Sequence, residues 1–292
     1  MDRVSVYIPC YNGERYLQGS LEALLRQTCA PDEILVIDDA STDHSVEVAS
    51  RYPVRVIRHE HNKGLAAARN TGILNSRNEL VASVDQDVAA NPDWLEKLLP
   101  SIRRDGFAGG GGKLVEKFQQ SLADQWRATH MRQDLGEHPR DDLRIMSTNN
   151  TLFKASAIKE VGLYNEIFRR TFEDWDMCHR LRRRGYRLYY RPDAVCNHLR
   201  RDTVSSAIKT WWRWRAPAWL QQPLTLESLL TKIRVDLRDC LADMAKRDWQ
   251  RHQLRLTGVD LLLASYSIYA DLRCYLRDRG RAPFAVEAEP RG

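Results

Sequence analysis

Short apolar runs alternate with helical patterns along the first hundred residues, and this alternation limits the possible folds more than any other feature of the chain. Apolar runs of strand length occupy residues 4–8, 33–37, 54–57 and 80–84. Apolar positions at helical spacing occupy residues 14–27, 43–51 and 65–76. Strands that alternate with helices form βαβ units around a parallel sheet. The sequence therefore predicts an α/β protein with a mostly parallel sheet flanked by helices.

The pattern becomes less regular after residue 87. Pro92 suits the first turn of a helix that runs to about residue 104. A Gly-rich strand or turn is predicted at residues 109–115, further helices at 116–133, 155–161 and 173–184, and further strands at 146–153 and 187–190, the last closed by Pro192. Helical patterns dominate from residue 203. We therefore predict two halves of one domain, residues 1–100 and 101–202, and a helical C-terminal extension, residues 203–292.

Charge is distributed unevenly along the 292 residues, which carry a formal net charge of +6. Residues 1–100 hold 10 Lys and Arg against 15 Asp and Glu, a net charge of −5, whereas residues 101–199 carry +5 and residues 200–292 carry +6. The basic part could face anionic lipid, an acidic glycan or a diphosphate. A solvated basic surface explains most of these charges equally well.

Membrane and secretion signals are absent from the sequence. The longest uncharged apolar stretch, residues 261–270, is shorter than the roughly 20 residues that span a bilayer. The N-terminus has no hydrophobic signal-peptide core. Six cysteines lie far apart with no CxxC pair, which favours a reducing compartment. We expect a cytoplasmic protein, with peripheral attachment to the inner face of the membrane as an option for its basic part.

Polar side chains follow the predicted strands. The strand ends and the third helix supply Tyr11, Asn12, Asp38, Asp39, Arg69, Asp85 and Asp87. In a parallel sheet the carboxyl ends of the strands meet at one edge, where such sheets bind ligands. An aromatic ring can stack on a base, carboxylates can accept from ring N–H groups or ribose hydroxyls, and paired carboxylates can hold a hard divalent ion. This edge is the predicted ligand site.

The strand-end segments resemble those of the family 2 glycosyltransferases, which have the GT-A fold. The similar segments, in chain order, are residues 4–12, 38–43, 62–64, 68–72, 85–87, 173–176, 180–181 and 185–186. Each motif is weak alone, but their order over residues 3–200 makes the set specific. The resemblance implies a Rossmann-like sheet, a nucleotide-diphosphate sugar as donor, a divalent metal (Mn²⁺ or Mg²⁺) and transfer with inversion at the anomeric carbon.

The resemblance places the donor site in the first half of the domain. Tyr11 is similar to the residue that stacks on the base, Asp39 to the acceptor of a base N–H, and Arg69 to a residue that shapes this pocket. Asp85 would lie near the ribose or a metal-bound water. Asp87 would bind the metal, which as a Lewis acid neutralises the leaving diphosphate. The remaining donor-binding positions are Pro9, Asn12 and Gln86.

The resemblance places the catalytic base in the second half. Asp174 is similar to the carboxylate that takes the proton of an acceptor hydroxyl, help that is typically worth about 10²–10⁴ in rate. Glu173 and Asp176 would be supporting acids, and Trp175 would pack under an acceptor sugar. His198 is similar to a histidine that approaches the metal or diphosphate, and a purely structural role fits it equally. The implied acceptor is a hydroxyl of a glycan, a lipid-linked molecule or another compound, in polysaccharide or glycoconjugate biosynthesis.

Several of these segments also have structural interpretations. Asp43 is expected to cap the helix that follows it, and Asp85 and Asp87 could do the same for the next one. Acids at the start of the 173–184 helix and cations at its end both suit the helix dipole, so the basic run 180–184 does not require nucleic acid. For the segment Trp211, Trp212, Arg213, Trp214 and Arg215, a core or lid position is favoured over a peripheral membrane contact.

Three other functional classes remain as alternatives. A nucleotidyltransferase would carry a Gly-rich loop with Arg or Lys after the first strand, and residues 9–13 do not match that pattern. A non-catalytic module that binds sugar nucleotides or glycans would not require Asp87 and Asp174, and both are present. RNA binding by the basic part would show a steep salt dependence, and nucleic acid is not an expected partner.

Overall fold

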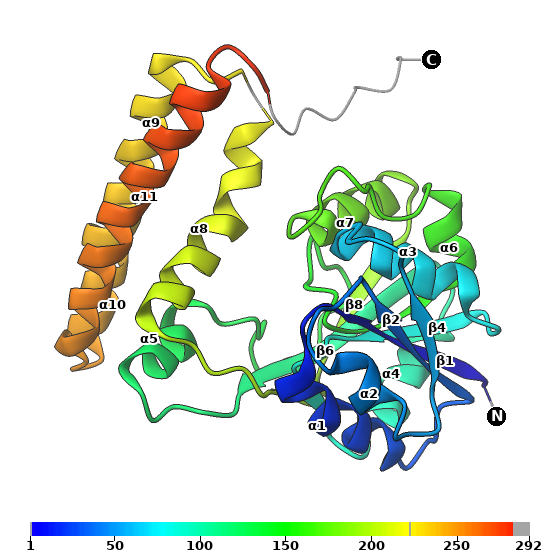
Figure 1. The fold of residues 1–292 in the computed structure, drawn as a ribbon. Helices are drawn as coiled ribbons and strands as arrows, with labels where there is room; N and C mark the ends of the chain where they lie inside the picture. The colour runs from blue at the N-terminus through cyan, green and yellow to red at the C-terminus, as the bar shows by residue number, and fades with distance from the viewer. Residues whose placement is uncertain (1, 222, 283–292) are drawn as a thin grey trace. The chain divides into compact units, whose positions relative to one another are not determined.

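The computed structural model describes residues 2–221 and 223–282, and the chain forms two compact units (Figure 1). The first, the α/β unit, comprises Met1–Lys117 and Arg132–Arg200. The second, the helical unit, comprises Phe118–Met131 and Arg201–Gly292. The short segment Phe118–Met131 therefore lies with the C-terminal helices, although the sequence places it within the second half of the α/β domain.

An eight-stranded mixed sheet forms the centre of the α/β unit, in the order β3-β2-β1-β4-β7-β6-β8-β5. The strands are β1 Val4–Cys10, β2 Glu33–Asp38, β3 Arg55–Arg58, β4 Leu80–Val84, β5 Val88–Ala90, β6 Phe107–Glu116, β7 Asn150–Lys154 and β8 Arg187–His198. The first four in chain order are parallel, as predicted. Beyond β4 the sheet is mixed: β7 is antiparallel to both its neighbours, β8 is parallel to β6, and β5 is antiparallel to β8.

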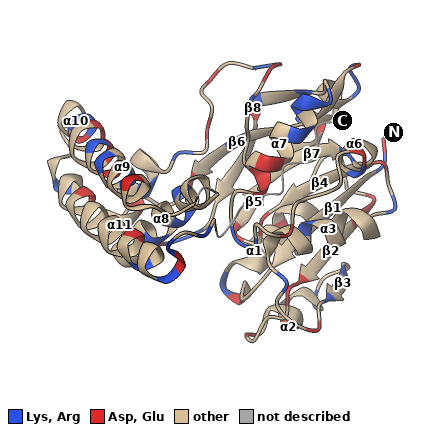
Figure 2. Ribbon diagram, turned by 90° about the horizontal axis from the view of Figure 1, so that it is seen from above, with Lys and Arg blue, Asp and Glu red and all other residues tan. Residues whose placement is uncertain are grey.

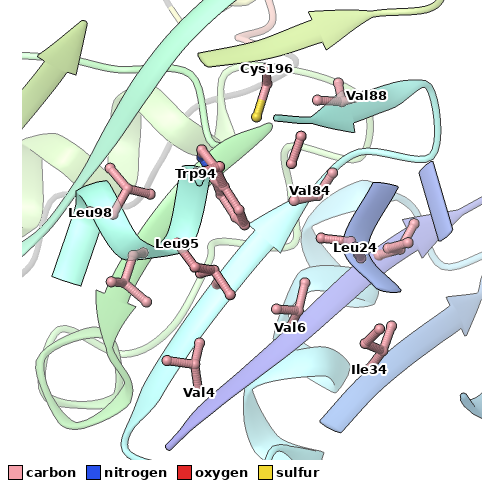
Figure 3. Packing of buried hydrophobic residues seen from close by; sticks show 14 of the residues in the cluster. Val4, Val6, Leu24, Ile34, Val84, Val88, Trp94, Leu95, Leu98 and Cys196 are labelled. Atoms are coloured by element: carbon pink, nitrogen blue, oxygen red, sulfur yellow. The ribbon is translucent and has the colours of Figure 1, made fainter. Parts of the chain in front are cut away.

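Helices cover both faces of the sheet. They are α1 Glu14–Leu25, α2 Ser45–Ala49, α3 Leu65–Asn75, α4 Trp94–Ile102, α6 Ala155–Glu160 and α7 Glu173–Arg183. Side chains of α1, α2 and α4 belong to one core cluster, and those of α3, α6 and α7 to the other. Figure 3 shows Trp94, Leu95 and Leu98 of α4 in the first cluster with Val4 and Val6 of β1. Alternate residues of each central strand thus face opposite cores, as the pleat requires.

Three strands differ by more than two residues from the sequence-based expectation, and one of them, β7, begins at Asn150 rather than at residue 146. The predicted strand 187–190 does not end before Pro192, because β8 continues to His198 past an irregularity between Arg191 and Val195. A proline is tolerated at such a bulge, where no ladder hydrogen bond is needed. Gly112 lies opposite, and a Cβ atom there would come within 1.8 Å of the Ala194 carbonyl oxygen, so only glycine fits. The three-residue strand β5 was not predicted, and it pairs Val88 with His198.

Loop residues tie the starts of two helices together. The Asp43 carboxylate accepts hydrogen bonds from the backbone N–H of Ser45 at the start of α2 (3.1 Å) and of Glu14 at the start of α1 (3.0 Å). The expected capping role of Asp43 thus extends to a second helix. These contacts fix the loops after β1 and β2 relative to each other, at the carboxyl edge of the sheet.

The helical unit is built from long helices and shorter turns. They are α5 Leu122–His130, α8 Val204–Leu220, α9 Leu226–Leu237, a π-helical stretch Arg238–Met244, α10 Ala245–Gln250, a 3₁₀ turn Leu254–Leu256 and α11 Thr257–Asp278. Capping boxes at Ser121, Thr203 and Thr225 set the starts of α5, α8 and α9. Over the described residues, no helix combines the length and apolar character needed to cross a membrane.

The Trp/Arg segment of α8 packs within the helical unit. The Trp211 ring meets Trp126 edge-on at 6.0 Å, and the Trp212 indole donates to the Asp271 carboxylate (2.7 Å). Arg127 lies over the ring of Trp214 at 5.8 Å. These contacts agree with the core interpretation of the segment. A membrane contact through it stays a prediction.

Candidate active site

The loop after β1 leaves one aromatic ring open to solvent. Tyr11 is 47% exposed, and its backbone N–H donates to the Gln86 side chain (2.8 Å), which in turn donates to the Tyr11 carbonyl (3.3 Å). Asn12 has a left-handed φ of 50°, and its side chain accepts from the backbone of Thr42 (2.9 Å). Pro9 is the β1 residue paired with Ile37 of β2. Three strand-end loops therefore meet around an accessible ring, as a base-stacking site requires.

Asp39 lies buried beside this loop. Its carboxylate accepts from the backbone N–H groups of Lys63 and Gly64, each at 2.8 Å, and lies 2.8 Å from Nδ1 of His59. The other ring nitrogen of His59 is 2.9 Å from the Thr71 hydroxyl. Asp39 thus holds the loop that precedes α3 while lying at the predicted base pocket. His59, at the end of β3 and 20 residues from Asp39, was not among the predicted site residues.

Arg69 joins the two predicted halves of the site. Its guanidinium is fully buried and donates to Ser83 (2.7 Å), to the Thr148 carbonyl (3.0 Å) and to Asp85 (3.0 Å). Its Nε lies 3.4 Å from the Glu173 carboxylate. The arginine that was expected to shape the base pocket therefore connects the end of β4 with the start of α7.

The acids that follow β4 lie near a histidine of β8. Burial raises the pKa of the Asp85 carboxyl, against the lowering by Arg69. The Asp87 carboxylate lies 3.4 Å from Nε2 of His198, whose Nδ1 is 3.0 Å from the Glu116 carboxylate. The β5–β8 pairing produces this approach. Glu116 was missed because residues 116–133 were predicted as a helix, whereas Glu116 ends strand β6.

The Asp87–His198 pair has the donor chemistry of a metal site. A carboxylate oxygen and an imidazole nitrogen suit Mn²⁺, and carboxylates alone suit Mg²⁺. Metal-binding histidines commonly donate their second ring N–H to a carboxylate, the place that Glu116 occupies. The residues present therefore fit the expected ion.

Helix α7 begins with the predicted catalytic acids, and Figure 2 shows its acidic start and basic end. Phe172 precedes it with a left-handed φ of 79°. Burial raises the pKa of Asp174. Burial and the neighbouring charge of Asp174 raise the pKa of Glu173 to about 8, although the positive charge of Arg69 lowers it. Asp176 instead accepts from Arg180 (2.9 Å), four residues along the helix.

Trp175 forms part of an aromatic column on α7. Its ring stacks between Phe172 (4.8 Å between centroids) and His179 (5.2 Å), yet it remains 40% exposed. The two neighbouring rings cover the faces of the indole, so the exposed part of the ring is what remains for contact with a sugar. This surface lies next to Asp174, since the two residues are adjacent in the chain.

Known proteins share sequence with this chain over most of the α/β unit. The sequence model described as Glycosyl transferase family 2 matches residues 5–162. The chain is 31% identical over 213 residues to the pre-mycofactocin glycosyltransferase of Mycobacterium tuberculosis. The aligned region covers 69% of this chain and 43% of that protein. It is 37% identical over 105 residues to the glycosyltransferase GlyA of Streptococcus pneumoniae, covering 35% of this chain and 15% of that protein. The chain thus spans less than half the length of these relatives.

Solved structures share the fold at low sequence identity. TarS 1–349 of S. aureus superposes with a TM-score of 0.59 at 15% identity, over 94% of this chain and 91% of that one. The mannosyltransferase PcManGT of Pyrobaculum calidifontis, in complex with GDP-Man and Mn²⁺, gives 0.58 at 18% identity, over 94% and 80%. The family match, covering more than half of the chain, and this common architecture lead to one conclusion: the chain belongs to glycosyl transferase family 2 and has the GT-A fold.

Proposed function

We propose that this protein transfers a sugar, with inversion, from a nucleotide-diphosphate sugar to a hydroxyl acceptor in polysaccharide or glycoconjugate biosynthesis. The observation that carries the proposal is the position of Arg69, which binds Asp85 at the end of β4 and lies 3.4 Å from Glu173, the neighbour of Asp174. One buried cation thus links the acids of the donor side to the helix that holds the base. A nucleotide sugar as donor is supported by similar structures in complex with UDP-GlcNAc or GDP-Man.

The donor site is proposed at the loops after β1, β2 and β4. The exposed ring of Tyr11 stacks on the base, and the Asp39 carboxylate accepts one of its N–H groups. Asp39 already accepts from two backbone N–H groups, so it is held in place before the nucleotide arrives. Gln86 keeps the Tyr11 loop in position. Preorganised groups of this kind bind without a further ordering penalty.

The divalent metal is proposed at Asp87 and His198. When bound, the ion neutralises the charge that develops on the leaving diphosphate. Glu116 fixes the orientation of the His198 ring through Nδ1. Asp85 lies two residues from Asp87, with its side chain 27% exposed, and is proposed to contact the ribose or a metal-bound water.

Asp174 is proposed as the general base. The acceptor oxygen forms a bond to the anomeric carbon, the bond from that carbon to the diphosphate breaks, and the acceptor proton passes to the Asp174 carboxylate. Burial raises the pKa of Asp174, which makes its carboxylate a stronger base than an ordinary aspartate. Trp175 offers its exposed ring to the acceptor sugar. Glu173 keeps its own proton below about pH 8, so it adds no second charge beside the base.

The alternative functions are distinguished by turnover. A sugar-nucleotide or glycan-binding module would bind its ligand without using Asp174, and a nucleotidyltransferase would release pyrophosphate rather than a nucleoside diphosphate. A cytoplasmic location is proposed for the protein, with a peripheral membrane contact through its basic Trp/Arg segment. Trp211 and Trp212 contact residues of their own unit, so exposed side chains such as Trp249 or Leu276 would add to such a contact.

The donor site is tested first by thermal shift. UDP, GDP, dTDP and CMP are each added with and without Mn²⁺ to the wild type, to Asp87→Ala and to the control Asp93→Ala, which removes an acid of the loop before α4. One nucleotide is expected to raise Tm only with metal, because a ligand of the native state stabilises it, and only Asp87→Ala should lose the effect. No shift with any nucleotide would contradict the donor site.

The base is tested by Asp174→Asn, which keeps the shape of the side chain and removes its basicity. We expect transfer to fall by about 10²–10⁴ while the nucleotide-induced Tm shift is unchanged. The matched control is Asp176→Asn, two residues along α7, which loses a salt bridge with Arg180 and should retain most activity. An Asp174→Asn enzyme with wild-type turnover would exclude Asp174 as the base.

A further inference from the structure

Three ionisable side chains meet in the interior of the helical unit, away from the residues used above. His130 ends α5, Asp248 lies in α10 and Asp260 lies in the first turn of α11. Nε2 of His130 is 2.8 Å from an oxygen of Asp248 and 3.9 Å from an oxygen of Asp260. All three side chains are 0% exposed. Nothing in the proposed transfer reaction accounts for this cluster.

The cluster is short of hydrogen-bond partners. Among the described residues, Nδ1 of His130, Oδ2 of Asp248 and Oδ2 of Asp260 are buried and accept or donate no hydrogen bond. Trp126 donates to the other oxygen of Asp260 (2.7 Å). Buried polar atoms are nearly always paired, and an unpaired buried carboxylate is strongly unfavourable. The two unpaired carboxylate oxygens belong to the residues that Nε2 of His130 faces, which points to a ligand bound between these side chains.

We propose that His130, Asp248 and Asp260 bind a structural divalent transition-metal ion of the Zn²⁺ class. One ligand atom from each residue can be chosen so that all lie within 4.8 Å of one another. Ligand atoms around a tetrahedral Zn²⁺ ion lie roughly 3.4 Å apart, so side-chain rotations that bring these atoms closer would complete the site. A mixed set of one imidazole and two carboxylates suits such an ion, and the Trp126 indole orients a ligand from outside, as surrounding donors do.

Charge balance favours an ion over a shared proton. Both carboxyl groups are fully buried beside one imidazole, so each negative charge needs a counter-charge close by. One proton between the carboxylates neutralises a single charge of two, whereas a divalent ion neutralises both. The cations that act on the cluster are Arg247 and Arg251, and both side chains belong to exposed residues, where solvent screens them.

Metal analysis of the purified full-length chain tests this site. The protein is prepared without chelators, and its metals are counted by mass spectrometry in the wild type, Asp87→Ala and Asp248→Asn. Asp87→Ala removes the proposed catalytic ion, so a metal that persists in it belongs elsewhere. We expect about one transition-metal equivalent per chain to persist in Asp87→Ala and to be lost in Asp248→Asn. A metal-free Asp87→Ala protein, or a metal that Asp248→Asn retains, would overturn the proposal.

A second measurement covers variants that fold poorly. Zn²⁺ added to metal-stripped wild type should raise Tm by roughly 5 °C or more at saturation, and Asp260→Asn should not respond. The matched control is Asp271→Asn, on the same helix and equally buried but in a different ion cluster, which should respond like the wild type. If the stripped wild type ignores Zn²⁺ and Asp260→Asn is at least as stable at pH 8, a shared proton occupies the cluster and the metal inference fails.

Discussion

Each unit of the molecule buries one cation between two carboxylates, and the comparison shows what such a contact does and does not indicate. In the α/β unit Arg69 lies between Asp85 and Glu173. In the helical unit Lys232 lies between Asp236 and Asp271, the latter at 3.3 Å. The Asp271 carboxylate also accepts from Trp212. In both clusters a buried cation contacts carboxyl groups from two separate segments of the chain.

The surroundings of the two cations differ. Asp85 follows strand β4 two residues before Asp87, and its side chain is partly exposed. Glu173 begins helix α7 and directly precedes Asp174. The partners of Lys232 lie within α9 and α11, on helix faces that pack together. A buried ion pair is weak evidence for either stability or function by itself. Its position at the sheet edge, where ligands bind, distinguishes the first cluster from the second.

Replacing Arg69 by Met should produce the largest effect and should affect both stability and activity. The change leaves the Asp85 carboxylate without its cation and the Thr148 carbonyl without its donor, and breaking a buried pair typically lowers the free energy of unfolding by about 3–5 kcal/mol. Since the arginine also positions both sides of the site, transfer should fall by about 10² even in folded protein. Denaturant unfolding and initial rates measure the two effects. Arg69→Lys should be intermediate in both stability and transfer rate. An Arg69→Met protein with the stability and activity of the wild type would show that Arg69 does not link the two halves of the site.

Replacing Lys232 by Met is the matched change in the helical unit, and it should affect stability alone. Burial raises the pKa of Asp271 to about 6 even with the lysine present, so this carboxyl can take up a proton when the lysine is lost. The loss in unfolding free energy should therefore fall below the roughly 3–5 kcal/mol of an uncompensated buried charge. Rates measured well below the lowered Tm should match the wild type. A large drop in kcat would show that the comparison fails and that the helical unit contributes to transfer.

Most of the α/β unit could be predicted because its local patterns agree with its tertiary structure. The runs at residues 4–8, 33–37 and 80–84 are strands that bury both faces, so their composition is mostly apolar. Strand β8 was predicted too short because a proline normally ends a regular strand, and Pro192 was expected to end this one. The bulge that accommodates Pro192 is visible only in the pairing of β8 with β6. Strand β5 has three residues, too few for any periodic signal.

The positions of the candidate site residues could be predicted where these residues follow a strand, but not where they depend on contacts between distant segments. Tyr11, Asp39 and Asp87 all lie at the carboxyl edge of the sheet, as the motif spacing indicates. Glu116 contacts His198 across 82 residues, and His59 gains its place from the loop that Asp39 holds. The buried acids of α11 face inward although its exposed side carries Leu261, Leu262 and Leu276. Hydrophobic periodicity therefore predicts that this segment is helical, but it does not predict which face of α11 is buried.

The smallest effect expected is a pH dependence of stability that Glu173 contributes. Its pKa is about 8 in the folded protein against an ordinary value of 4.5, so between these values the folded chain holds a proton that the unfolded chain releases. The free energy of unfolding must then fall as pH rises through this range. Glu173→Gln, which copies the protonated form, should remove this part of the dependence. Between pH 6 and 8.5 the Tm of the wild type should fall by roughly 2–4 °C more than that of the variant. If Tm depends on pH in the same way in the wild type and in Glu173→Gln, Arg69 keeps Glu173 ionised. Arg69 would then act on Glu173 as Lys232 acts on Asp236, through charge pairing alone.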